Sequence, residues 1–174
     1  PDFEIFKKRG LTAVTNPASN LKLASGICPT KRFVDEGIAM AIGTDGPASN
    51  NCLDMFREMF LTSTLAKVRE MDAECVCADE ILYMATAGGA HAMQLADCDS
   101  LAVGKKADLV MIDLKQPNMQ PENNLVKNLV YSGSKQNVKL TMVNGRVLYE
   151  EGRFDIGFDP EEIYAKANAI TRRL

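Results

Sequence analysis

One short stretch constrains the fold of this chain more than any other. The apolar run Ile38 to Ile42 leads directly into Gly43-Thr44-Asp45-Gly46. An unbroken apolar run of this length is typical of a strand that is buried on both faces, as in a parallel sheet. Open α/β folds collect their functional groups where such strands end. Asp45 is therefore the leading candidate for a functional carboxylate.

The first hundred residues predict alternating helices and strands. Gly10 ends a first helix, and Asn16-Pro17 forces an extended or turn geometry after a short strand. Methionines at apolar positions of these elements are expected to fill the core. The predicted elements are a helix ending at Arg9, a strand Leu11 to Thr15, a helix Thr30 to Glu36, a strand Ile38 to Ile42, a helix Leu53 to Glu70 with Met55, Met59, Phe56 and Phe60 on its apolar face, and a helix Ala78 to Leu95 that Gly88-Gly89 lets pack closely; the core methionines are Met40, Met55, Met59, Met84 and Met93.

The pattern changes near Asp97, after which short strands and turns dominate. Asn144-Gly145 readily adopts the positive φ angles of a type I′ hairpin turn, and Pro160 followed by two glutamates begins a terminal helix. We expect an α/β protein with three parts: residues 1–97, a small β segment over 98–159 and a helix over 160–174. The predicted strands are Asp108 to Leu114, Leu125 to Tyr131, Val138 to Val143 and Arg146 to Glu150.

Composition narrows the class of protein. The 20 basic and 23 acidic residues give a net charge of -3 without a basic stripe, which argues against a nucleic-acid partner. No apolar run is long enough to cross a bilayer. Five cysteines without a Cys-x-x-Cys pair indicate reduced thiols, and Cys75-Val76-Cys77 offers too few ligands for a structural zinc site. We expect a soluble, cytoplasmic protein without a membrane partner.

Three motifs carry a resemblance to a known family. They are Asn16-Pro-Ala-Ser-Asn-Leu-Lys-Leu-Ala-Ser-Gly26, Gly43-Thr-Asp-Gly-Pro-Ala-Ser-Asn-Asn51 and Leu101-Ala-Val-Gly-Lys-Lys-Ala-Asp-Leu-Val110. In order and spacing the chain resembles the amidohydrolase superfamily, over essentially its whole length. Within that superfamily it is most similar to the S-adenosylhomocysteine and 5′-methylthioadenosine deaminases and their chlorohydrolase relatives.

The resemblance implies the C-terminal part of a metal-dependent (β/α)₈ barrel plus a small β-sandwich segment. Leu11 to Thr15 would be strand seven, Ile38 to Gly43 strand eight, and Asp45 a ligand of a divalent metal, zinc or iron. Asp45 would also be the catalytic base, because a divalent cation lowers the pKa of its water to about 7 and a neighbouring carboxylate can accept the proton. Taken alone, Asp45 would be a turn or helix-capping aspartate. The histidine ligands and a proton-shuttling glutamate of the family would precede Pro1, so the chain is expected to begin in mid-domain and to hold an incomplete centre.

The remaining polar residues of the motifs have more ordinary interpretations. Loop shaping is favoured over substrate contact for Ser19, Asn20 and Lys22, which follow the first strand. Ser49, Asn50 and Asn51 are expected to order the loop after Asp45 and to cap the next helix. A solvated turn accounts for Lys105 and Lys106, and a surface or packing role for His91, the single histidine.

The leading functional hypothesis is hydrolysis of a C-N bond by the full-length parent, with deamination of an adenine-type purine nucleoside. A triazine- or guanine-type deaminase or chlorohydrolase is the alternative with the same metal chemistry. A non-catalytic remnant that acts as an interaction module is the alternative from another class. A nucleotide-binding domain with Asp45 on a ribose ranks last, because no glycine-rich phosphate loop is present. Strand edges left uncovered predict self-association.

Overall fold

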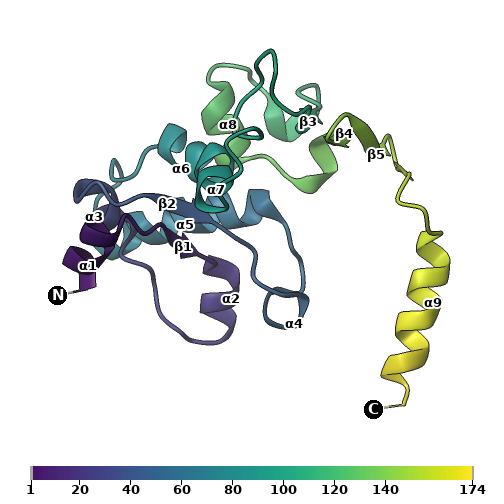
Figure 1. The fold of residues 1–174 in the computed structure, drawn as a ribbon, viewed down its shortest axis with the longest axis horizontal. Coiled ribbons are helices and arrows are strands. Elements are labelled where there is room, and N and C mark those ends of the chain that lie inside the picture. The colour runs from purple at the N-terminus through teal and green to yellow at the C-terminus, as the bar shows by residue number, and fades with distance from the viewer. Residues whose placement is uncertain (1, 174) are drawn as a thin grey trace. The chain divides into compact units, whose positions relative to one another are not determined.

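The computed structural model describes residues 2–173, which fold as two compact units (Figure 1). The first unit comprises the residues up to Ser100 together with Leu114–Asn137, and the second comprises Leu101–Asp113 together with the residues from Val138 onward. The segment Leu114–Asn137 thus folds with the first unit, whereas the sequence pattern predicts it as part of the β segment. The predicted boundaries near residues 97 and 159 stay predictions for the domains of a longer protein.

Two short parallel strands form the centre of the first unit. β1 (Ala13–Thr15) pairs with β2 (Met40–Ile42), with Ala13 opposite Met40 and Thr15 opposite Ile42. Every residue of β2 is buried, as the apolar run predicts. The connection runs through α2 (Pro17–Lys22) and α3 (Thr30–Asp35), and α1 (Asp2–Arg9) precedes β1. The crossover is therefore the helical one that parallel strands require.

The helix α5 (Met55–Glu70) packs against β2 and against its helical neighbours α2 and α3. The N-cap residue Asp54 begins it by accepting a hydrogen bond from the Phe56 amide. The predicted apolar face is wrong in part, because Phe60 is 43% exposed. The buried face differs from the predicted one and includes polar side chains. It consists of Glu58, Met59, Thr62, Ser63 and Ala66.

The single helix predicted over Ala78 to Leu95 is in fact two helices, α6 (Ala78–Ala85) and α7 (Ala87–Ala92). Thr86 breaks the helix with a φ of -126° and a ψ of -98°. The break brings Gly88 so close to the strand that a Cβ there would lie 2.7 Å from the Met40 carbonyl oxygen. Met93 follows α7 and is 67% exposed, so its predicted core position is wrong, whereas Met40, Met59 and Met84 are buried.

The strand predicted over Leu125 to Tyr131 is also wrong, because the structure places the helix α8 (Leu125–Tyr131) there. Asn124 caps it by accepting a hydrogen bond from the Lys127 amide. The physical reason is tertiary packing, since one face of α8 joins the core through Val126 and Val130 and overrides the β preference of its valines. Short 3₁₀ turns, η1 (Pro117–Met119) and η2 (Lys135–Asn137), flank it.

The second unit is a four-stranded antiparallel sheet with a terminal helix. Its strands lie in the order β3 (Leu109–Ile112), β4 (Val138–Val143), β5 (Arg146–Glu150) and β6 (Arg153–Phe154). Asn144 and Gly145 have φ angles of 50° and 79°, which confirms the predicted hairpin turn. The predicted terminal helix is α9 (Pro160–Thr171), capped by Asp159.

Helix length bears on membrane insertion. Across residues 2–173, none of the helices combines the length and the apolar character that a membrane span requires.

Candidate functional site

Asp45 lies just beyond the carboxyl end of β2, between Gly43-Thr44 and the short helix α4 (Pro47–Asn50). Its backbone is left-handed, with a φ of 58°. Aspartate tolerates this conformation better than most side chains, because its short polar group can hydrogen-bond locally. The side chain remains exposed to solvent.

Three hydrogen bonds orient the Asp45 carboxylate. Ser19 Oγ donates to Oδ2 at 2.6 Å, Ser49 Oγ donates to the same oxygen at 2.7 Å, and the Gly46 amide donates to Oδ1 at 2.8 Å. The bond from Ser19, followed by those from Ser49 and Gly46, holds the pKa of Asp45 below its ordinary value. Asp45 is thus a charged carboxylate with a fixed direction at neutral pH.

The arrangement fits one ligand of a metal ion. A carboxylate offers about four lone-pair positions, and the three hydrogen bonds leave room for one more partner on Oδ1. Within the described residues no group of three or more His, Cys, Asp or Glu side chains comes together to hold a metal. A catalytic zinc site takes three protein ligands. Asp45 can therefore supply one ligand, and the others would have to come from outside residues 2–173.

The ends of the two strands touch beside Asp45. The Gly43 amide donates to the Thr15 carbonyl oxygen at 2.9 Å, and a Cβ on Gly43 would lie 2.5 Å from Asn16 Oδ1. Glycine at position 43 thus makes room for the Asn16 side chain. The two motifs that are separate in sequence, at Asn16 and at Gly43, form one polar edge.

The segment of Ser19 and Lys22, expected to be a loop, is the helix α2, and its last residue orders the segment after Asp45 instead. Lys22 Nζ donates to the Ala48 carbonyl oxygen at 3.0 Å and also bonds the Asn51 side chain. Ser49 was expected only to order the loop, but its hydroxyl group also donates a hydrogen bond directly to the Asp45 carboxylate. The predicted capping of the next helix is wrong, because the N-cap of α5 is Asp54.

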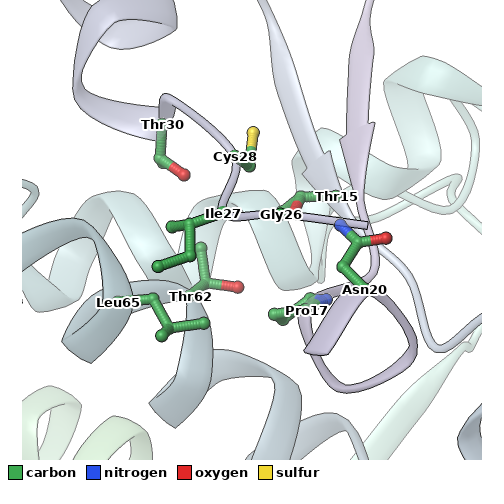
Figure 2. Close-up of a pocket in the computed structure, with 9 residues that line it drawn as sticks. All are labelled: Thr15, Pro17, Asn20, Gly26, Ile27, Cys28, Thr30, Thr62 and Leu65. Atoms are coloured by element: carbon green, nitrogen blue, oxygen red, sulfur yellow. The ribbon is translucent and has the colours of Figure 1, made fainter. Parts of the chain in front are cut away.

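A small cavity lies behind this edge, between the β1–α2 segment and α5 (Figure 2). Its volume is about 10 Å³, which is room for about one water molecule. Asn20, Cys28 and Thr62 are among the residues that line it. A larger cavity of about 450 Å³ lies near the other end of β2 and is lined by residues that include Ile38, Met40 and Met84. Neither cavity includes Asp45, so neither is a substrate pocket around it.

The remaining candidates lie elsewhere in the fold. On α7, His91 contacts Tyr83 OH through Nδ1 at 3.1 Å and Asp99 Oδ2 through Nε2 at 2.9 Å. Cys75 is buried, and burial raises the pKa of its thiol, whereas Cys77 is exposed and caps α6. Lys105 and Lys106 follow the Gly104 turn that leads to β3.

Sequence reasoning missed Glu58, which is fully buried on α5. Its Oε2 accepts a hydrogen bond from the Ala18 amide at 2.9 Å, and its Oε1 accepts one from Asn50 Nδ2 at 2.7 Å. No signal in the sequence pointed to it, because the residues four positions away, Asp54 and Thr62, are polar, although in the structure Glu58 lies with Thr62 on the buried face of the helix. An acidic residue on such a face requires partners.

A parallel strand pair that ends on an oriented carboxylate defines an α/β protein with a polar edge at the carboxyl ends of its strands. Comparison with known proteins then identifies the family. The sequence pattern of the Amidohydrolase family matches residues 2–148, so the chain belongs to the amidohydrolase family.

Individual relatives agree with this assignment. The chain is 44% identical over 171 residues to a 5-methylthioadenosine/S-adenosylhomocysteine deaminase of Nitratidesulfovibrio vulgaris. This match covers 98% of the chain and 39% of the relative. Its similarity to the protein of the same name in Dictyoglomus thermophilum is 42% identity over 166 residues, 95% of this chain and 39% of that one. The chain thus spans about two fifths of the length of these relatives.

Solved structures show the same fold. A zinc-bound adenosine deaminase from Xanthomonas campestris matches 99% of this chain with a TM-score of 0.93 and 37% identity, over 39% of its own length. The zinc complex of an atrazine chlorohydrolase from Arthrobacter aurescens matches 97% with a TM-score of 0.85 and 27% identity, over 37% of its own length. Both neighbours carry zinc, which supports a divalent metal in this family fold.

Proposed function

We propose that this chain forms part of a zinc-dependent deaminase of adenine-type purines, in the S-adenosylhomocysteine and 5′-methylthioadenosine class. The observation that carries the proposal is Asp45, which stands at the end of a buried parallel strand with its carboxylate oriented by Ser19, Ser49 and Gly46. Relatives that bear this name align with nearly the whole chain.

In this proposal β1 and β2 are strands seven and eight of a (β/α)₈ barrel, and the sheet of the second unit belongs to a small β-sandwich. The parallel pairing of β1 with β2 and the TM-score of 0.93 to the adenosine deaminase support the assignment. Barrel enzymes of this kind carry their active sites at the carboxyl ends of the strands, which is where Asp45 lies.

Asp45 has two roles in the proposed chemistry, ligand of the zinc and base. When bound, the metal would supply Lewis acidity and lower the pKa of its water to about 7. The lowered pKa keeps the Asp45 carboxylate charged at neutral pH in the free site, so it would be available both as a ligand and as a proton acceptor. Ser19 and Ser49 fix the carboxylate direction by donating to Oδ2. Oδ1, which accepts from the Gly46 amide, keeps a lone pair that would be available to the metal.

A hybrid protein tests the proposal. The 174 residues replace the matching segment of the Nitratidesulfovibrio vulgaris relative, and purified hybrid is assayed for ammonia release from methylthioadenosine, S-adenosylhomocysteine and adenosine. We expect zinc-dependent release with the wild-type segment and none with Asp45→Asn. A folded, zinc-loaded hybrid that leaves all three purines intact would contradict the proposal.

One alternative substrate class is supported by a specific observation. The atrazine chlorohydrolase matches 97% of the chain at 27% identity, so triazines and guanine belong on the same substrate panel. The higher identity to the deaminases favours a purine. Self-association and a cytoplasmic location stay predictions.

A further inference from the structure

Glu58 connects two segments that are distant in sequence. Its carboxyl group lies fully inside the first unit, where one oxygen binds the Ala18 amide at 2.9 Å and the other binds Asn50 Nδ2 at 2.7 Å. Ala18 lies in the first turn of α2, after β1, and Asn50 ends α4, after β2. A buried carboxyl group is costly without such partners, so these contacts constrain both segments strongly.

Both partners of Glu58 are next to the residues that hold Asp45. Ala18 precedes Ser19, and Asn50 follows Ser49; the hydroxyl groups of these two serines donate to Asp45 Oδ2 at 2.6 and 2.7 Å. Glu58 therefore restrains the backbone at Ala18 and the side chain of Asn50, each of which is adjacent in sequence to one of the two donors that orient the carboxylate.

Asn50 extends the restraint to the backbone directly before Asp45. Its Nδ2 also donates to the Thr44 carbonyl oxygen at 2.6 Å, and its Oδ1 accepts from the Cys52 and Leu53 amides, each at 3.3 Å. Leu53 has a φ of 47°, a left-handed conformation that a leucine adopts only when its surroundings impose it. The Asn50 side chain cannot turn over without losing these contacts.

We propose that Glu58 is a positioning residue for Asp45, acting through the Ala18 amide and Asn50. The catalytic consequence rests on the proposed function, whereas the ordering of the Asp45 segment does not. Glu58 makes no contact with the reacting groups in this account. It sets the direction of Ser19 and Ser49, and these set the direction of the carboxylate.

Hydrogen exchange in the 174-residue chain tests the ordering without any activity. Gln at position 58 retains the shape of the side chain but places a donor against either the Ala18 amide or Asn50 Nδ2. Glu58→Gln should speed exchange of the Gly46 amide, which bonds Asp45, by about tenfold or more. Glu70→Gln is the matched control, because Glu70 ends the same helix and is exposed. Unchanged Gly46 exchange in Glu58→Gln would overturn the proposal.

Kinetics of the zinc-loaded hybrid separate positioning from mere stability. Glu58→Gln should lower kcat by about tenfold, at the lower end of the effect of residues that orient metal ligands, while the KM and the zinc content stay close to wild type. Glu70→Gln should leave kcat unchanged. A residue that only stabilised the fold would lower the yield of folded protein and not the kcat of the folded fraction.

A double variant supplies the rescue. Asn50→Asp alone sets two carboxyl groups against each other, whereas Glu58→Gln with Asn50→Asp restores a donor and an acceptor across the 2.7 Å contact. We expect the double variant to have a higher kcat than Asn50→Asp alone. Independent, additive losses would overturn the proposal. If the wild-type hybrid deaminates no purine, the proposed function fails, and Gly46 exchange still decides whether Glu58 orders the Asp45 segment.

Discussion

Replacing Gly88 by alanine would insert a methyl group between α7 and β2, the strand that leads to Asp45. The new Cβ would lie 2.7 Å from the Met40 carbonyl oxygen and 3.0 Å from the Tyr83 carbonyl oxygen. Both atoms belong to the backbone and cannot rotate away. Because ordinary contacts begin at 3.4 Å, α7 would have to move by about 0.7 Å.

The size of the effect follows from two opposing terms. Overpacking of this kind costs about 1–3 kcal/mol, and the immobile backbone partners place Gly88→Ala near the upper end. Alanine in place of glycine inside a helix returns up to about 1 kcal/mol. We therefore expect a net loss of about 2 kcal/mol. A Cβ added at Gly89 would meet nothing within 4 Å, so Gly89→Ala should gain up to about 1 kcal/mol.

Urea unfolding followed by circular dichroism measures the difference between these neighbouring variants. With a slope of about 2 kcal/mol/M, Gly88→Ala should lower the midpoint by about 1 M, and Gly89→Ala should leave it equal or higher. The two variants make the same Gly-to-Ala change in the same helix, so helix propensity alone predicts the same change in the urea midpoint for both. Equal midpoints for the two variants would refute the close contact between α7 and β2.

Three further predictions concern charge, thiols and chain association. Hydrogen bonds from Lys7 and then Arg32 hold the pKa of Glu36 below its ordinary value, so their stabilising effect is present at neutral pH and is lost as the pH falls through that lowered pKa. Lys7→Ala should raise the pKa of Glu36 in a carboxyl NMR titration, and an unchanged pKa would contradict this. Cys77 should react with a thiol reagent within the folded chain while buried Cys75 reacts only on unfolding, and equal labelling rates by mass spectrometry would contradict the placement of the two thiols. The 174-residue chain should self-associate through exposed apolar side chains such as Val14, which is 54% exposed; a clean monomer in sedimentation at high concentration would count against it.

The central strand and the hairpin were predictable because their signals are local. An apolar run of five residues closed by glycine and aspartate leaves few options other than a buried strand, and β2 is buried throughout. Asn144-Gly145 determines a turn type through its own φ angles. The position of Asp45 at the strand end followed from the same local pattern.

The failures were at positions that tertiary contacts decide. Valines in Leu125 to Tyr131 favour a strand by propensity, but packing of Val130 against the core makes the segment helical. Glu58 could not be assigned a role from the sequence, because its two partners, at positions 18 and 50, are remote in sequence and known only from the fold. The donors to Asp45 were visible as serines, yet their convergence on one oxygen was not.

The most direct test of the account is a crystal structure of the zinc-loaded hybrid that carries this chain. We predict an Asp45 carboxylate oxygen at about 2.0–2.2 Å from the zinc, with Ser19 and Ser49 still donating to Oδ2. A structure in which zinc is bound by other residues and Asp45 lies beyond ligand distance would contradict the assignment of Asp45 to the metal site.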